Sequence, residues 1–382
     1  MQCDYFDAGA CRSCTHLRTP YERQLAAKDA RVRAIVGARP GLTWEAPVAS
    51  RESGFRTKST MVAASTPDAP TLGILDAAGR GVDLSACGLL GPATAAAMPR
   101  LREFVAEAGL RPYDVPARSG ELKHVHVVEA ADGGLLVRFV LRSPGQIGRL
   151  RRHLPRLREL VPGVRVVSVS LLPEHKAVTS GDEEVLLSDE ATLALPVGDV
   201  TLHVMPGAFV QTNAAVAGEL YREAARWIDA VDPASVLDLY CGVGGFALHA
   251  ARSASASGGR ARRVHGVEVS PEAVTSARRS AAEAGLAATF ETADATTYAL
   301  ALPTPDLPEL VVVNPPRRGI GAQLAGWLED SGVRHVLYSS CNPATLAKDL
   351  DAMPSLQPVR ARLFDMFPQT DHAEVLTLLR RR

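Results

Sequence analysis

A short apolar run that ends in three closely spaced glycines constrains the fold of this chain more than any other feature. It spans residues 236–246, with the sequence VLDLYCGVGGF, and predicts a buried strand, a tight turn and the start of a helix. Gly242, Gly244 and Gly245 let the backbone bend sharply and approach a ligand closely. A glycine-rich turn alone is weak evidence, because many such runs are only tight turns.

The pattern of the chain changes near residue 210. Beyond it, helical and buried-strand patterns alternate, which indicates a mostly parallel sheet covered by helices. The expected strands are 235–239, 264–269, 310–313 and 335–339, the helices 214–230, 246–252, 271–284 and 343–352, and β-rich runs close the chain at 360–367 and 373–379. Before residue 210, strands are expected at 58–64, 123–129, 135–141, 164–171 and 200–205, with two or three helices between them. The serine- and glycine-rich stretch 253–259 is expected to be a flexible surface loop.

Polar residues stand where successive strands of the second half are expected to end. Glu268 closes one strand, Asp294 follows the next, and Asn314 precedes two prolines after a third. Ligands of open α/β sheets collect at these carboxyl ends, where Glu268 can accept hydrogen bonds from both ribose hydroxyls of an adenosine. Asp294 is placed to meet the adenine edge. Because the turn lacks the regular G-x-G-x-x-G spacing of dinucleotide sites, the series favours S-adenosylmethionine and predicts a Rossmann-like methyltransferase domain of the α/β class.

Two reactive residues are expected at the same edge of the sheet. Cys341 stands at the tip of a strand, before a helix that starts at Pro343, and the helix dipole is expected to lower its pKa and keep it exposed. Glu374 precedes the apolar run 375–379, so it is expected at a strand end as a partly buried general base. Taken singly, a cysteine is more often a small buried hydrophobe, the role that we assign to Cys241, and a glutamate is more often a surface residue.

Five motifs occur together in the second half of the chain. They are FVQTN at 209–213, DLYCGVGGF at 238–246, NPPR at 314–317, SCNP at 340–343 and HAE at 372–374. In this order they resemble the RNA (uracil-5)-methyltransferase family. The resemblance implies Cys341 as nucleophile and Glu374 as base. It also implies contacts to S-adenosylmethionine from Gln211, Tyr240, Glu268 and Asn314, with Asp294 a weaker candidate.

The implied chemistry explains why these residue types are needed. C5 of uracil is too weakly nucleophilic to attack a methyl group, but addition of a thiolate to C6 turns C5 into an enolate carbon that can. After methyl transfer the C5 proton must leave, so that the thiolate can be eliminated, and a carboxylate is suited to remove it. The target base must be unstacked to reach the cysteine, which favours a looped or flipped uridine.

Four further cysteines are candidate metal ligands: Cys3, Cys11, Cys14 and Cys87. By ligand type, four sulfurs suit zinc and an iron–sulfur cluster equally well, and reduced, unliganded cysteines are a third interpretation. The chain resembles the bacterial 23S ribosomal RNA members of the family, which carry a [4Fe–4S] cluster on similarly spaced cysteines. The resemblance therefore implies such a cluster, with the structural role of tying the N-terminal segment to the domain near Cys87.

The charges cancel only in total. Forty-two basic and forty-two acidic side chains balance, but residues 12–58 carry ten basic against four acidic and residues 100–165 thirteen against seven. Residues 166–199 carry one basic against seven acidic. Five arginines crowd one expected helix, at positions 149, 151, 152, 156 and 158. Such a run is either a solvated helix face or a surface that follows RNA phosphates.

The chain has 382 residues, which is more than a single hydrophobic core usually organises, and we expect three parts. These are an iron–sulfur segment at 1–40, a β-rich α+β domain at 41–205 that binds RNA and includes Cys87, and the catalytic domain at 206–382. With Cys3 as the first cysteine we expect no N-terminal β-barrel, and Asn314 stands where other branches of the family have an aspartate. Both features resemble the subgroup that acts on a 23S hairpin loop, with uracil 747 favoured. No run of eighteen apolar residues or secretory signal is present, so we expect a cytoplasmic protein, monomeric and without membrane or DNA partners.

Three other functions remain open at this point. A transfer-RNA uracil-C5 methyltransferase would use identical chemistry, although the N-terminal cysteines argue against it. An amino-methyltransferase would use NPP to hold an exocyclic amine, but an aromatic residue usually follows where this chain has Arg317. A non-catalytic iron–sulfur RNA-binding protein would lack a nucleophile, and Cys341 is present.

Overall fold

The computed structural model describes residues 1–256 and 262–382, which divide into two compact units. The first unit contains Met1–Cys14, Glu52–Leu195 and Val204–Gly207. The second contains Thr15–Arg51, Pro196–His203 and Ala208–Arg382. The expected segment 1–40 is thus shared between the units, with its first fourteen residues in one and the remainder in the other. The three-part division stays a prediction.

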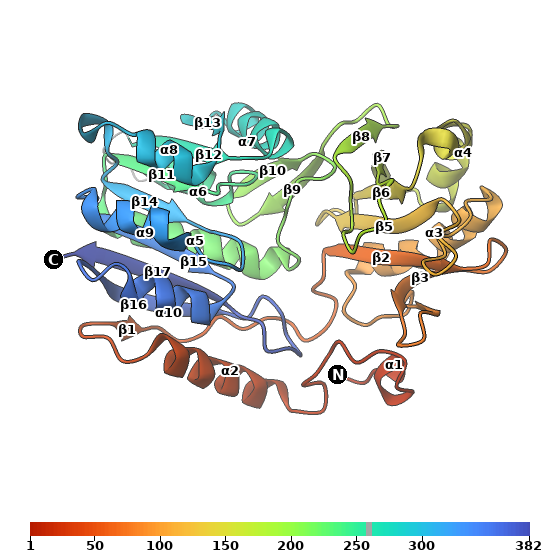
Figure 1. The fold of residues 1–382 in the computed structure, drawn as a ribbon, viewed down its shortest axis with the longest axis horizontal. Helices are drawn as coiled ribbons and strands as arrows, with labels where there is room; N and C mark the ends of the chain where they lie inside the picture. The colour runs from red at the N-terminus through yellow and green to blue at the C-terminus, as the bar shows by residue number, and fades with distance from the viewer. Residues whose placement is uncertain (257–261) are drawn as a thin grey trace. The chain divides into compact units, whose positions relative to one another are not determined.

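The second unit is built on an eight-stranded sheet with the order β1-β16-β17-β15-β14-β11-β12-β13 (Figure 1). Its strands are β1 (Thr43–Trp44), β11 (Ser235–Leu239), β12 (Arg263–Glu268), β13 (Ala288–Thr292), β14 (Leu310–Val313), β15 (His335–Ser340), β16 (Leu356–Phe364) and β17 (Glu374–Arg381). Strands β11 to β15 are parallel to one another, whereas β17 is antiparallel to both β15 and β16. The parallel sheet and the Rossmann-like fold expected from the alternating pattern are confirmed.

Helices cover both faces of this sheet. They are α2 (Tyr21–Val36), α5 (Ala214–Val231), α6 (Gly245–Ala256), α7 (Pro271–Glu283), α8 (Ala295–Ala301), α9 (Gly321–Asp330) and α10 (Pro343–Asp351), with a 3-10 turn at Thr304–Asp306. Figure 1 shows α8, α9 and α10 in front of the strands and α5 and α6 behind them. Residues 253–256, expected in a loop, instead complete α6. Residues 257–259 of that expected loop lie outside the described residues.

Short polar side chains begin four of these helices. Asn213, Ser270, Asp294 and Asn342 each accept a hydrogen bond from a backbone amide in the first helical turn. Each of the last three follows a parallel strand, so the same residues that start the helices mark the carboxyl edge of the sheet. This edge is where the predicted site residues gather.

The first unit contains a seven-stranded sheet with the order β4-β3-β2-β5-β6-β7-β8. Its strands are β2 (Lys58–Ser65), β3 (Pro70–Leu75), β4 (Gly81–Asp83), β5 (Leu122–Glu129), β6 (Leu135–Leu141), β7 (Val164–Leu171) and β8 (Glu183–Leu186). Its helices are α1 (Asp4–Asp7), α3 (Pro92–Glu107) and α4 (Ile147–Leu160), with a 3-10 turn at Pro144–Gln146. Alternate residues of β5 and β6, such as Val125, Val127 and Phe139, form the core with α3 and α4. A separate hairpin joins β9 (Leu193–Val197) and β10 (Val200–Val204).

No helix among the described residues is both long enough and apolar enough to span a bilayer.

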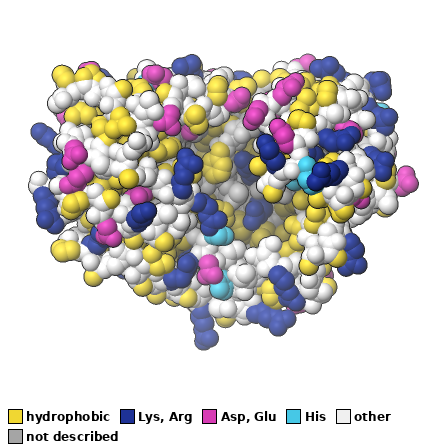
Figure 2. Space-filling model, in the orientation of Figure 1, with side chains coloured by type: hydrophobic (Ala, Val, Ile, Leu, Met, Phe, Trp, Pro, Cys, Tyr) yellow, Lys and Arg dark blue, Asp and Glu magenta, His cyan; other side chains and the backbone are white. Residues whose placement is uncertain are grey.

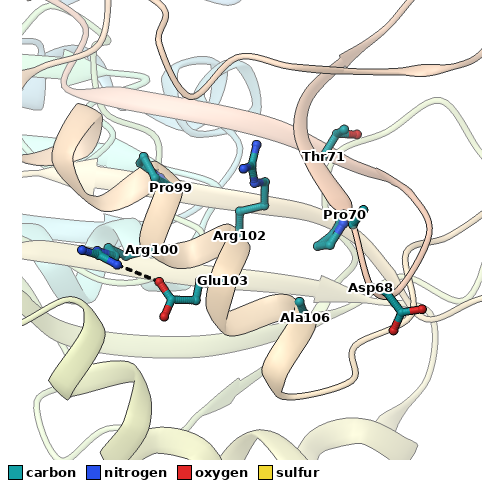
Figure 3. A pocket seen from close by; sticks show the side chains of 9 residues that line it. Asp68, Pro70, Thr71, Pro99, Arg100, Arg102, Glu103 and Ala106 are labelled. Carbon is teal, nitrogen blue, oxygen red and sulfur yellow. Dashed lines mark hydrogen bonds and ion pairs between the residues drawn. The ribbon is translucent and has the colours of Figure 1, made fainter.

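A surface pocket of about 640 Å³ lies between α3 and the start of β3 (Figure 3). Two arginines line it, and both are engaged: Arg100 is paired with Glu103 and Arg102 with Asp83. None of the predicted cofactor, catalytic or cluster residues lines this pocket. The predicted cofactor and catalytic residues all lie in the second unit.

Candidate active site

The turn between β11 and α6 bends sharply, as the sequence predicts. Tyr240, Gly242 and Gly244 all have positive φ angles, of 63°, 53° and 87°. Gly245 is small for a different reason, since an added Cβ would lie 2.4 Å from the ring of Tyr221. The turn is thus shaped by its backbone at three positions and by packing at the fourth.

Glu268 joins this turn to the next strand. Its carboxylate accepts hydrogen bonds from the backbone amide of Gly242 at 3.1 Å, and from Val269 and Ser270 at 2.8 and 3.0 Å. These three bonds fix the side chain at the carboxyl ends of β11 and β12. They also use most of the roughly four acceptor positions of a carboxylate. A ribose that bonds Glu268 through both hydroxyls would therefore displace an amide bond.

The other predicted cofactor residues occupy neighbouring strand ends. Asp294 caps α8 and accepts from the amide and hydroxyl of Thr297 at 2.8 and 3.0 Å, which hold its pKa below the usual range. Tyr240 is half-buried, and its hydroxyl is hydrogen-bonded to Thr296 and feels the charge of Asp294. Asn314 follows β14 and Gln211 precedes α5, both half-buried. Within the described parts of the chain, neither amide side chain is hydrogen-bonded to the other cofactor residues.

Asp238, in the middle of the same motif, is a residue that the sequence reasoning did not single out. Its side chain is fully buried, and burial is the main cause that raises its pKa to about 8. One oxygen accepts from the amide of Ala247 at 3.0 Å, whereas Oδ1 has no hydrogen-bond partner among the described residues. An unpartnered buried acceptor beside a glycine turn is suited to a ligand that donates hydrogen bonds.

Cys341 lies directly after β15, next to the first turn of α10. It is half-buried, and burial, followed by the charge of Glu374, raises the pKa of its thiol, while Arg317 lowers it. The expectation that the helix would leave this thiol exposed with a lowered pKa is therefore wrong for the free protein. The influence of a helix N-terminus is outweighed here by desolvation and by a neighbouring carboxylate.

Glu374 begins β17, the strand that pairs antiparallel with β15. Its side chain is 2 % exposed, and burial raises its pKa to about 7. The hydroxyl of Ser339 donates a 2.5 Å hydrogen bond to Oε1 and favours the charged form. The pairing of these two strands is what brings Glu374 within electrostatic reach of Cys341, although 33 residues separate them in the sequence.

Arg317 connects three segments around Cys341. Its guanidinium lies 3.0 Å from Nδ1 of His372, and its carbonyl accepts from the side-chain amide of Asn342 at 3.0 Å. The positive charge favours the thiolate of Cys341. In the sequence Arg317 only distinguished one family from another. Its role at the thiol needs the folded arrangement of three loops.

Comparison with known proteins now decides the family. The chain is 42% identical to the 23S rRNA (uracil(747)-C(5))-methyltransferase RlmC of Shigella boydii serotype 4 (strain Sb227) over 381 residues, and 43% identical to that of Escherichia coli O9:H4 (strain HS). Each alignment covers 99% of both proteins. The chain belongs to the RNA (uracil-5)-methyltransferase family. Residues 303–382 match the family described as tRNA (Uracil-5-)-methyltransferase, and residues 236–313 match a methyltransferase domain.

A solved uracil methyltransferase shows the same architecture. The tRNA (uracil-54, C5)-methyltransferase of Pyrococcus abyssi, in complex with S-adenosyl-L-homocysteine, superposes with a TM-score of 0.79 at 25% identity. The match covers 97% of this chain and 84% of that one. The family resemblance read from the five motifs is confirmed, and so is the class of S-adenosylmethionine-dependent methyltransferases.

In this chain, helix α2 holds the loop that leads to Glu374. Lys28 of α2 and Asp365 form a buried ion pair of 2.6 Å, and Tyr21 donates to the second oxygen of Asp365 at 2.8 Å. Gln24 donates to the side chain of Gln369 at 2.8 Å and accepts from its backbone amide at 3.1 Å. We call these five residues the α2 network. The sequence reasoning missed it, because it assigned residues 1–40 to the iron–sulfur segment.

The four N-terminal candidate ligands lie in the first unit, where Cys14 is buried and the other three are half-buried. Burial, followed by the charges of Cys87, Cys11 and Cys3 in that order, raises the pKa of Cys14 to about 11. The thiols are therefore close enough to repel one another when charged. Among the described residues, no group of three or more His, Cys, Asp or Glu side chains is arranged to hold a single metal ion. The expected cluster stays a prediction.

The five arginines of α4 divide between two roles. Arg149 donates to the carbonyls of Ala108 and Gly109, Arg156 is paired with Glu107, and Arg158 lies 3.9 Å from Asp189. Positions 151 and 152 are exposed, and neither arginine has an ion pair in the described part of the chain. Figure 2 shows basic and acidic side chains distributed over the visible face of the molecule. An RNA-binding role of α4 stays a prediction that would rest on positions 151 and 152.

Proposed function

We propose that this protein transfers a methyl group from S-adenosylmethionine to C5 of a uridine in 23S ribosomal RNA, with uracil 747 favoured. The observation that carries the proposal is that a half-buried thiol and a buried carboxylate, Cys341 and Glu374, lie within electrostatic reach at the adjacent ends of two paired strands. The full-length identity of 42–43% to enzymes named for uracil 747 supports the choice of target. Because that target is ribosomal RNA, we also infer a cytoplasmic location.

The cofactor would lie at the carboxyl ends of β11 to β14, and the residues there fit it. Glu268 and the glycine turn supply the ribose contacts, Asp294 and Tyr240 border the adenine, and Gln211 and Asn314 supply further polar contacts. The unpartnered Oδ1 of Asp238 is an acceptor for an ammonium group. When bound, S-adenosylmethionine supplies the methyl group as an electrophile.

Cys341 would act as the nucleophile. The thiolate forms a bond to C6 of uracil, and the C5–C6 electron pair moves into the enolate that C5 needs in order to take up the methyl group. Since burial and Glu374 raise the pKa of the thiol, the thiolate must be favoured by the positive charge of Arg317. The half-buried position of Cys341 limits the access of water to the covalent adduct.

Glu374 would act as the base. With a pKa of about 7, its carboxylate is ionised in a useful fraction of molecules and has a driving force to accept a proton. When Glu374 removes the proton from C5, the C5–C6 double bond re-forms and the bond between C6 and the sulfur breaks. The products are 5-methyluridine, S-adenosylhomocysteine, the free thiolate of Cys341 and the protonated carboxyl group of Glu374.

The target is tested with labelled S-adenosylmethionine. We expect label to enter 23S ribosomal RNA that lacks this methylation, at a single uridine, when that RNA is incubated with the protein and the modified position is mapped. Fully methylated 23S RNA serves as the matched control and should remain unlabelled. Label in transfer RNA but not in 23S RNA would instead support the second candidate, which the fold shared with the Pyrococcus abyssi enzyme favours.

We further infer that Cys3, Cys11, Cys14 and Cys87 hold a [4Fe–4S] cluster. The mutual electrostatic effects of the four thiols support this, since a positive cluster would relieve the repulsion between their thiolates. A cluster also separates its cysteines more widely than a single ion does, because iron and sulfide lie between the sulfurs. Its role would be structural, in a first unit that also binds RNA through residues 41–205.

The cluster is tested by metal analysis after anaerobic purification. We expect about four iron and four sulfide per chain, together with broad visible absorbance that is lost when Cys14 is replaced by serine. The Cys241→Ala variant is the matched control, because Cys241 lies in the second unit and should leave the iron content unchanged. One zinc per chain without iron would contradict the proposal.

A further inference from the structure

Ser339 is a buried hydroxyl next to the proposed base. It lies on β15, is inaccessible to solvent, and donates to Oε1 of Glu374 at 2.5 Å. In the strand pairing, Ser340 stands opposite Val375 and Ser339 opposite Leu376, so the contact joins two adjacent strands at the edge of the site. The contact is fixed by the sheet and does not depend on a loop.

The hydrogen bond distinguishes the two oxygens of the carboxylate. Oε1 is occupied by Ser339, and Oε2 is left to accept a proton. A hydroxyl that donates to a carboxylate also stabilises its charged form, and in a desolvated site this effect is larger than in water. Burial acts on Glu374 in the opposite direction, and Ser339 is the hydrogen-bond partner that offsets it.

From this geometry we propose that Ser339 is a positioning residue for proton abstraction, which holds Oε1 of Glu374 so that Oε2 receives the C5 proton of the methylated adduct. The inference rests on the proposed function, and it concerns only the second half of the reaction. Ser339 need not affect the formation of the bond between Cys341 and C6. Proton abstraction and release of Cys341 depend on it.

The test separates these two halves in single-turnover reactions with the RNA substrate. The covalent complex between protein and RNA is quantified on denaturing gels, and the rates of its formation and decay are measured between about pH 6 and pH 9. In Ser339→Ala we expect complex to form at the wild-type rate and to decay about tenfold more slowly at neutral pH. In a plot of decay rate against pH, the rise on the acidic side should shift to higher pH by about one unit, because loss of the donor raises the pKa of Glu374. Ser339→Thr keeps a hydroxyl and should restore the profile.

A matched control comes from the neighbouring strand. Thr377 is also fully buried, on β17, and its hydroxyl has no hydrogen-bond partner among the described residues. Thr377→Val should leave both phases unchanged.

The outcomes are distinguishable. If the covalent complex of Ser339→Ala decays with the wild-type rate and pH profile, the proposal is wrong. If the substitution slows the formation and the decay of the complex by the same factor, Ser339 acts only in packing and the proposal is also wrong. The Glu374→Gln variant should form complex and retain it. If neither that variant nor the wild type forms any complex, the proposed function fails instead.

Discussion

Replacement of Cys341 by alanine is expected to abolish methylation, with a rate loss of at least about four orders of magnitude. Loss of a covalent nucleophile has effects of this size in other enzymes. Without the sulfur, C5 of uracil never becomes an enolate carbon, so no alternative route remains at a comparable rate. The measurement is methyl transfer from labelled S-adenosylmethionine to the ribosomal RNA under single-turnover conditions.

Two controls accompany this experiment. Binding of S-adenosylmethionine to Cys341→Ala should be unchanged, because the predicted cofactor residues lie at the ends of β11 to β14 and before α5, and none of them lies on β15. RNA that carries 5-fluorouridine at the target should trap the wild type as a covalent complex, because C5 then carries a fluorine in place of the proton that the base must remove. The same RNA should not trap the variant. Methylation by Cys341→Ala at the wild-type rate would refute the mechanism.

The second large effect is expected on stability. Lys28→Met leaves the carboxylate of Asp365 buried without its cation, which should lower the free energy of unfolding by about 3–5 kcal/mol. The side chains of the pair are 3 % and 1 % exposed, so water cannot replace the lost partner. For a unit of this size the expected change in apparent Tm is roughly 10 °C, measured by calorimetry or circular dichroism.

Arg23→Met is the matched control for this substitution. Arg23 lies on the same helix but is exposed, and its loss should change stability by less than about 0.5 kcal/mol. The double variant Lys28→Met/Asp365→Leu removes both charges and should recover most of the loss. Equal Tm values for Lys28→Met and Arg23→Met would show that the buried pair does not stabilise the fold.

The sheet and its strand ends were predictable from the sequence because each polar site residue follows an apolar run. Glu268, Asp294 and Asn314 mark the ends of β12, β13 and β14 in this way. The glycine turn was predictable for a similar reason, since few residues other than glycine adopt positive φ.

The role of α2 was not predictable in the same manner. Its buried residues are Gln24, Lys28, Val32 and Val36, which recur every four positions as a helix requires. Two of these four residues are polar, so the sequence pattern does not predict that this face of the helix packs against a core. The buried partners, Asp365 and Gln369, lie more than 300 residues away in the sequence.

The pKa of Cys341 was predicted with the wrong sign for a related reason. The helix that follows it is visible in the sequence, but Glu374 and the packing that desolvates the thiol come from elsewhere in the chain. Ser339 is likewise unremarkable within an apolar strand until β17 places Glu374 beside it.

The α2 network also has a consequence for how such proteins can be recombined. A gene fragment that starts at residue 206 would encode every motif of the catalytic site but neither Lys28 nor Gln24. The same fragment would lack β1, which pairs with β16 at the sheet edge. Fusing residues 206–382 to a foreign RNA-binding module should therefore yield an unstable chimera, whereas a graft that also carries residues 15–51 keeps the contacts of α2 and β1 with the catalytic fold.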